Sequence, residues 1–286
     1  LYSSAASDVY KRQGIYKAIR PYLLEERIRE CGFFMQKNRK RIFTWILLFT
    51  VSIQVFWWDG ISVSAEPAAI EAPSAVLLES STGKVIFEQN ARERRSPASI
   101  TKIMTLLLAV ENCSLKEDVV FTETGTRDIS WDSGNIGMQV GEVMSMRACL
   151  YALVIRSANE VAAQIAEHVG GTEQHFVDMM NERAAQIGCT NTHFVNASGL
   201  PDPDHYSTAH DMALIMREGL KNKKFRRIIG TTDYTIKPTN MNSESRVLHT
   251  HHPMLAPESS YHYDGCIGGK TGYTSEAGNT LVTAAG

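Results

Sequence analysis

The stretch Ser96-Pro-Ala-Ser-Ile-Thr-Lys-Ile-Met-Thr105 decides the fold expected for this chain, because it opens a helix that only a protein core can accommodate. Ser96 suits the N-cap position and Pro97 the first helical position, so we expect a helix from here to about Glu111. A helix that is apolar nearly all round is buried. Apolar side chains lie on almost every side of this one: Ile100, Ile103, Met104, Leu106, Leu107, Leu108 and Val110.

The same stretch places a hydroxyl and an amine on one face of the helix, since Ser99 and Lys102 are three residues apart. Ser99 lies in the first turn, where free N–H groups and the helix dipole favour a developing anion. Burial disfavours the charged form of Lys102, which makes its amine a candidate general base. The alternative is that Ser99 is an ordinary first-turn residue and Lys102 extends to the surface. Ser-x-x-Lys alone does not decide between them.

Around this helix, the pattern of apolar residues, caps and turns predicts strands, then a helical block, then strands again. This order indicates an α+β fold, with the helices packed on one antiparallel sheet. The expected helices cover 96–111, 145–156, 160–168, 172–188 and 207–220, and the expected strands cover 75–78, 85–87, 268–274 and 280–284.

Two further short motifs are weak signals when taken singly. Ser157-Ala158-Asn159 lies between two expected helices, where Asn159 suits the N-cap of the second. Gly268-Gly-Lys-Thr-Gly272 resembles a phosphate-binding loop, but that loop needs a glycine where this chain has Asp264, and a helix where this chain predicts a strand. We therefore exclude a nucleotide site. Glycines in a strand allow another backbone to approach closely, and a lysine between them offers a charge for a carboxylate.

Taken together and in this order, Ser-x-x-Lys, Ser-x-Asn and Lys-Thr-Gly resemble the motif set of the D-alanyl-D-alanine carboxypeptidases, the low-molecular-mass penicillin-binding proteins. The resemblance covers about 74–286, including the segments 156–171, 191–200, 205–215 and 268–282. It implies the β-lactamase/DD-peptidase-like fold, which class A β-lactamases share. The family's common glycine at the middle of the second motif is Ala158 here.

The resemblance also implies a role for each motif residue. Ser99 is expected to form the acyl-enzyme, with Lys102 as its base and Ser157 as the proton relay toward the leaving amine. Asn159 is expected to hold the peptide amide of the substrate.

The third motif is expected to bind the terminal carboxylate of the substrate through Lys270, Thr271 and Gly272. The backbone N–H groups of Ser99 and Tyr273 are expected to form the oxyanion hole. The implied substrate is a peptidoglycan stem peptide ending in D-Ala-D-Ala, and the implied covalent inhibitors are β-lactam antibiotics. The resemblance implies no cofactor and no metal.

Two other functions remain open from the sequence. A class A-like β-lactamase would add a glutamate between the second and third motifs, where the segment 196–200 reads Asn-Ala-Ser-Gly-Leu. A non-catalytic fragment that binds penicillin or wall peptides would keep the motifs without turnover.

The N-terminal region predicts export. Met35 is followed by a basic segment at 37–41, an apolar run over 42–58 and the small-residue cleavage pattern Val63-Ser-Ala65, so 35–65 is expected to be a signal peptide. An uncleaved membrane anchor is the alternative, although a span needs about 20 residues. Residues 1–34 would then precede the start of translation and are expected to be an artefactual leader. We expect the domain at the extracytoplasmic face of the cell membrane or in the wall.

Charge argues against nucleic acid as a partner. The whole chain has a net charge of −2, with 29 basic and 31 acidic residues, but residues 1–65 hold 10 basic and 5 acidic ones, which leaves 66–286 at about −7. The remaining body is acidic, the opposite of a phosphate-binding surface. A basic run at 221–227 is expected to be a solvated face, and Cys149, in an apolar run, is expected to be buried.

Four histidines (His249, His251, His252 and His262) precede the third motif. A metal site is one interpretation, but a solvated loop is favoured, because we find no carboxylate at ligand spacing.

At the other end, the chain stops at Gly286, early in the strand after Lys-Thr-Gly. The family resemblance implies further strands, a C-terminal helix, a small β-rich domain and a membrane-binding tail. We therefore expect 66–286 to be a C-terminally incomplete catalytic domain that would reach the membrane surface only through that missing tail.

Overall fold

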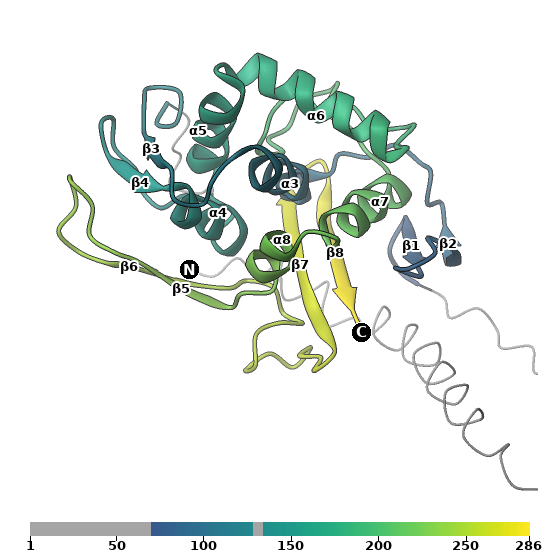
Figure 1. Ribbon diagram of the computed structural model, residues 1–286. Coiled ribbons are helices and arrows are strands. Elements are labelled where there is room, and N and C mark those ends of the chain that lie inside the picture. The colour runs from purple at the N-terminus through teal and green to yellow at the C-terminus, as the bar shows by residue number, and fades with distance from the viewer. Residues whose placement is uncertain (1–69, 128–133) are drawn as a thin grey trace, which may run out of the picture. The chain divides into compact units, whose positions relative to one another are not determined.

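The computed structural model describes residues 70–127 and 134–286 (Figure 1). The predicted leader at 1–34 and signal peptide at 35–65 lie outside the described residues. Within those residues, no helix is both long enough and apolar enough to cross a membrane. The compact unit considered below comprises Pro73–Gly286.

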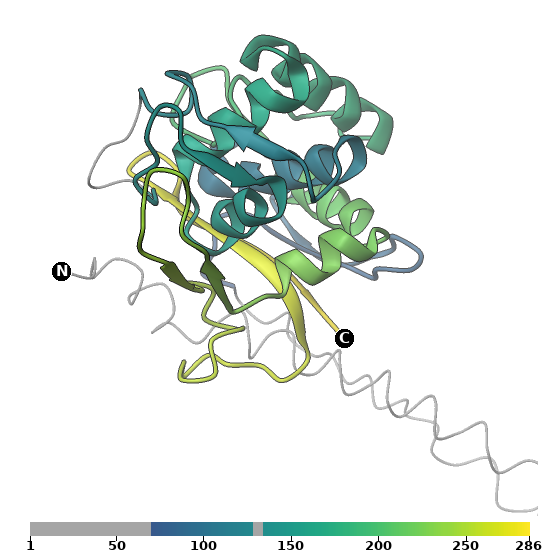
Figure 2. The ribbon, with the colours of Figure 1, turned by 60° about the vertical axis from the view of Figure 1, so that its left-hand side comes forward.

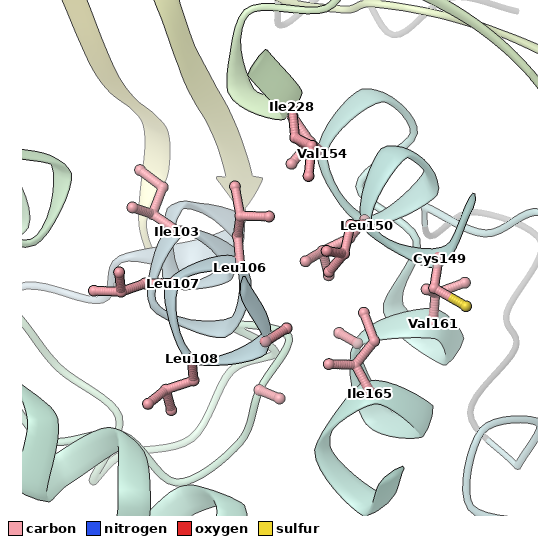
Figure 3. Close-up of a cluster of buried hydrophobic side chains, with 14 of the residues drawn as sticks. Ile103, Leu106, Leu107, Leu108, Cys149, Leu150, Val154, Val161, Ile165 and Ile228 are labelled. Carbon is pink, nitrogen blue, oxygen red and sulfur yellow. The ribbon is translucent and has the colours of Figure 1, made fainter. Parts of the chain in front are cut away.

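One helix occupies the centre of this unit. The 3-10 turn η2 (Ala98–Thr101) leads directly into α3 (Lys102–Asn112), and every residue of α3 from Lys102 to Val110 is buried. Side chains leave α3 in several directions, as Ile103, Leu106, Leu107 and Leu108 show in Figure 3. The prediction of a buried helix in the core is therefore confirmed.

Five other helices surround α3 and all contact it. They are α4 (Met146–Ile155), α5 (Asn159–Gly170), α6 (Glu173–Ile187), α7 (Ala209–Gly219) and α8 (Lys223–Ile229).

Several predicted helix ends are confirmed. The hydroxyls of Ser145 and Thr172 accept the backbone N–H of Ala148 and His175 at the starts of α4 and α6. Gly171 and Gly188, with φ of 74° and 96°, end α5 and α6 in the left-handed conformation.

Helix α8 is not predicted from the sequence, because its basic residues obscure a short apolar face. Phe225, Ile228 and Ile229 are buried against the core, whereas the charged side chains of Lys221, Lys223, Lys224, Arg226 and Arg227 are exposed. The solvated basic face is thus confirmed, although it belongs to a helix. Cys149 is buried as predicted, and the four cysteines of the described residues are free thiols.

The described strands form four separate antiparallel ribbons rather than joining into one sheet. The predicted hairpin is β1–β2 and the predicted C-terminal pair is β7–β8; two short ribbons were not predicted. The bounds are β1 (Ala75–Leu78), β2 (Val85–Gln89), β3 (Asp118–Val120), β4 (Val143–Ser145), β5 (Asp233–Ile236), β6 (Arg246–His249), β7 (Cys266–Thr274) and β8 (Gly278–Ala285). The α+β class is confirmed, and the ribbon β7–β8, drawn in yellow in Figures 1 and 2, contacts η2.

Candidate active site

The candidate site begins at a strained turn before Ser99. Ala98 is fully buried and has φ of 52°, a left-handed conformation that costs a side-chain-bearing residue about 1–2 kcal/mol. The prediction of Ser96 as N-cap is wrong: the turn follows Pro97 and has no side-chain cap. Instead, Thr280 of β8 donates its hydroxyl to the Pro97 carbonyl at 2.9 Å. The turn therefore presents Ser99 from a backbone that neighbouring elements hold in place.

Lys102 points into the site rather than to the surface, so the alternative of a surface lysine is excluded. Its Nζ lies 3.1 Å from Ser99 Oγ, 2.7 Å from Asn159 Oδ1 and 2.6 Å from the Ser198 carbonyl oxygen. The side chain is fully buried. Burial, reinforced by the positive charge of Lys270, holds the pKa of Lys102 well below its usual range, and Glu160 opposes this shift.

The loop that supplies the Ser198 carbonyl is tied to the same helix. Asn196 Oδ1 accepts the backbone N–H groups of Ser198 and Gly199. Thr105 of α3 donates its hydroxyl to the Ala197 carbonyl at 2.6 Å. A side chain at Gly199 would collide with the Ala98 carbonyl, 1.9 Å from an ideal Cβ. The sequence shows that this loop lacks a glutamate, but it does not reveal that the loop contacts Lys102.

His205 supports η2 from the other side, and its contact was also missed. Its Nδ1 accepts the Val195 N–H at 3.1 Å, which leaves Nε2 to donate to the Thr101 hydroxyl at 2.9 Å. Burial lowers the pKa of His205 to about 4. A neutral ring therefore joins the segment before the 196–200 loop to η2.

The second motif lies between α4 and α5, as predicted. Ser157 has φ of 57°, and its Oγ is buried without a hydrogen-bond partner among the described residues. An unpartnered buried hydroxyl is costly unless a ligand or water completes it. Asn159 does not cap α5, which corrects the prediction: Ala158 occupies that position, and the Asn159 amide faces Lys102 instead.

Glu160 is a buried carboxyl beside this motif that sequence analysis did not single out. It is 2% exposed and accepts the Ile136 N–H on Oε1 at 2.5 Å. Burial raises the pKa of Glu160. Gln164 and Glu167 lie four and seven residues after Glu160, so helical periodicity assigns Glu160 to a polar face and gives no signal of its burial.

Strand β7 forms the opposite side of the site. An ideal Cβ at Gly272 would lie 2.8 Å from the Ser99 backbone nitrogen, so the strand passes η2 as closely as a glycine permits. Tyr273 follows with an exposed side chain. The close approach predicted from the glycines is thus confirmed.

Lys270 is 3% exposed, and its Nζ donates to the neighbouring Thr271 carbonyl at 2.7 Å. Burial lowers the pKa of Lys270 to about 7. An ammonium held this far from water is electrostatically suited to receive an anion.

The histidine-rich loop differs from the solvated loop expected. His252 is 3% exposed, with Nε2 2.7 Å from the Thr283 hydroxyl of β8, and burial lowers its pKa to about 4. His249 lies 2.6 Å from the Asp233 carboxylate, a partner that chain spacing does not reveal. The loop is therefore partly packed against β8 through His252.

A serine hydroxyl beside a buried lysine amine, with a second buried lysine on an adjacent strand, is typical of enzymes that form an acyl-serine. The D-alanyl-D-alanine carboxypeptidase pattern, peptidase family S11, matches residues 61–286. The chain belongs to this family.

Relatives and solved structures agree with that assignment. The chain is 36% identical over 219 residues to "D-alanyl-D-alanine carboxypeptidase DacF" of Bacillus subtilis (strain 168), covering 76% of this chain and 54% of the relative. It spans about half the length of this relative. The crystal structure of the Streptomyces K15 DD-transpeptidase matches with a TM-score of 0.70 at 29% identity, covering 76% of this chain and 86% of that one. A Mycobacterium tuberculosis H37Rv D-alanyl-D-alanine carboxypeptidase matches with a TM-score of 0.68 at 29% identity, covering 75% and 78%.

Proposed function

We propose that this protein is a serine-type D-Ala-D-Ala carboxypeptidase that removes the terminal D-Ala from peptidoglycan stem peptides. The observation that carries the proposal is the Lys102 amine, fully buried and 3.1 Å from Ser99 Oγ. Family membership supports the substrate class.

Activation of the nucleophile follows from the partners of Lys102. A neutral amine has two N–H donors and one lone pair. The Asn159 and Ser198 oxygens can only accept, so they take the two donors and leave the lone pair for the Ser99 hydroxyl. Lys102 therefore removes the proton as Ser99 Oγ attacks the carbonyl carbon of the penultimate D-Ala.

The rest of the reaction uses the second motif and β7. As the peptide C–N bond breaks, Ser157 relays the proton that Lys102 took from Ser99 to the leaving amine, a role that its unpartnered buried hydroxyl supports. Asn159 holds the peptide amide of the substrate. Water then attacks the ester carbonyl, which releases the shortened peptide and returns the proton to Ser99.

Substrate recognition is assigned to β7. Lys270, Thr271 and Gly272 bind the terminal carboxylate, and burial of Lys270 strengthens that ion pair. The backbone N–H groups of Ser99 and Tyr273 bind the oxyanion, which the close approach of Gly272 to the Ser99 nitrogen supports.

The proposed setting is the extracytoplasmic face of a bacterial cell membrane or the wall, where stem peptides are found. β-lactam antibiotics are the proposed covalent inhibitors, because their ring amide presents an equivalent carbonyl to Ser99. Residues 35–65 are the proposed export signal.

The test is the intact mass of the full chain after incubation with benzylpenicillin. We expect one added penicilloyl group in the wild type and in Ser96→Ala, a matched control three residues upstream, and none in Ser99→Ala. Release of D-Ala from a D-Ala-D-Ala peptide should follow the same pattern. Labelling that persists in Ser99→Ala would reject the assignment.

The kinetics of the adduct separate the alternatives. Fast acylation with slow loss of the adduct supports a carboxypeptidase. Rapid turnover of penicillin would identify a β-lactamase, and binding without an adduct would identify a non-catalytic module.

A further inference from the structure

A second cluster of reactive side chains lies at the other end of α3 from the catalytic turn. Cys113 is the C-cap of α3, Glu117 directly precedes β3, and His168 lies in the last turn of α5. One ligand atom from each of them, a sulfur, a carboxylate oxygen and a ring nitrogen, lies within 4.8 Å of the other two. His168 Nε2 and Glu117 Oε2 are 3.2 Å apart. The proposed carboxypeptidase mechanism uses none of these residues.

We propose that Cys113, Glu117 and His168 form a zinc site that links the ends of α3 and α5, with water as the fourth ligand. Thiolate, imidazole and carboxylate are the side chains that bind Zn²⁺ in proteins. Tetrahedral bonds of about 2.0–2.3 Å place ligand atoms about 3.3–3.8 Å apart. The three ligand atoms lie within 4.8 Å of one another, at most about 1 Å farther apart than this geometry requires.

The carboxylate is already oriented for this role. The Ser114 backbone N–H donates to Glu117 Oε1 at 2.6 Å, which leaves Oε2 facing the imidazole of His168. An outer hydrogen bond of this kind fixes a ligating carboxylate before the metal arrives.

The local charge also favours a cation. Cys113 and His168 both lie at helix C-termini, where the dipole is negative. When Zn²⁺ binds, the Cys113 S–H bond breaks, a Zn–S bond forms and the proton leaves to solvent. Thiolate and carboxylate together then neutralise the ion. The side chains of His168 and Glu117 are 26% and 43% exposed, so the ion reaches the site directly from water.

The consequence is structural. Helix α3 begins at Lys102 and α5 at Asn159, the residue that accepts from Lys102. A metal bound at the C-terminal ends of α3 and α5 holds the two helices together. These helices carry Lys102 and its acceptor Asn159 at their other ends.

The first test uses Co²⁺ as a spectroscopic probe on the reduced full chain. We expect one equivalent to bind with a thiolate-to-cobalt charge-transfer absorption. This band should disappear in Cys113→Ser and persist in Cys266→Ser, the matched control, and in Ser99→Ala. A band that survives Cys113→Ser, or no band in the wild type, would overturn the proposal.

The second test uses Zn²⁺ and thermal unfolding, and it does not depend on the folding of Cys113→Ser. Ligand at about 100 times its Kd should raise the Tm by about 5–10 °C. His168→Ala and Glu117→Gln should lose most of this rise, whereas His175→Ala, an exposed histidine on α6, should keep it. An equal rise in His168→Ala and His175→Ala would show that the zinc binds elsewhere.

Discussion

The two sides of the candidate site each hold a buried lysine, but they surround it differently. On the helical side, the Lys102 amine has three oxygen neighbours from three separate segments. On the strand side, the Lys270 ammonium has one oxygen partner among the described residues, the carbonyl of the next residue. Both side chains are almost completely removed from water.

This difference indicates two electrostatic tasks. Two fixed acceptors, the Asn159 and Ser198 oxygens, hold the amine in place and leave its lone pair free to take a proton. A buried ammonium with few partners gains most when an anion arrives, because its lost hydration is then replaced. The helical side is therefore interpreted as the base and the strand side as the anion receptor.

The largest expected effect comes from converting the base to a permanent cation. Lys102→Arg retains the charge but cannot deprotonate, so the rate of acylation by benzylpenicillin should fall by about 10²–10⁴. Intact mass as a function of time measures it, with exposed Lys84→Arg as the control. A rate near that of the wild type would place the base elsewhere.

Lys270→Gln tests the anion receptor. Loss of one charge-assisted hydrogen bond costs about 1.5–3 kcal/mol, so kcat/KM on peptides with a free terminal carboxylate should fall about 10–100-fold. The matched comparison is the amidated peptide, on which the variant and the wild type should differ little. Equal losses on both peptides would contradict the assignment.

The two lysines also predict a bell-shaped pH dependence of kcat/KM, in which one lysine sets the rising limb and the other the falling limb. Burial lowers the pKa of Lys270 to about 7, so its ammonium is lost as pH rises through 7, and kcat/KM on carboxylate peptides should fall up to tenfold per pH unit. Deprotonation of Lys102, whose pKa is held well below its usual range by burial, gives the rising limb. Because the two lysines interact electrostatically, the apparent pKa of each limb describes the pair and not one residue alone. Lys270→Gln should abolish the falling limb; its persistence there would assign it to another group.

The smallest effect concerns the support of the base. Thr105→Val leaves the buried Ala197 carbonyl without its 2.6 Å donor, which should cost about 1–3 kcal/mol of unfolding free energy. Acylation should slow only a few-fold, because Lys102 keeps its own contacts. Thr235→Val, on an exposed position of β5, is the control and should unfold like the wild type. If the two variants have the same stability, the loop is not held through Thr105.

The parts of the site that the sequence predicts are those that depend on local spacing. Ser99 and Lys102 are one helical turn apart, and the glycines of β7 predict that another backbone approaches the strand closely. The Ser198 carbonyl is different: any residue there offers the same oxygen, and 96 positions separate it from Lys102. No side-chain pattern encodes such a contact.

The fold was likewise predicted where it depends on neighbouring residues in the sequence, and missed where it depends on distant ones. Caps at Ser145, Thr172 and Gly188 are local and were predicted, and so was the β1–β2 hairpin. The start of η2 was misplaced because the left-handed Ala98 is stabilised by packing against Gly199, not by its own preference. The ribbons β3–β4 and β5–β6 are short and held by tertiary contacts, which leave little trace in a strand of three or four residues.

Burial of α3 on all sides also has a kinetic consequence. Amides in the most buried elements exchange with solvent only when the whole domain opens, whereas exposed ends open on their own. Lys102 is the first residue of α3, so the geometry of the base should persist for as long as the domain stays folded. Heat inactivation should then coincide with global unfolding instead of preceding it, and the amide protons of α3 should be the slowest in the domain to exchange.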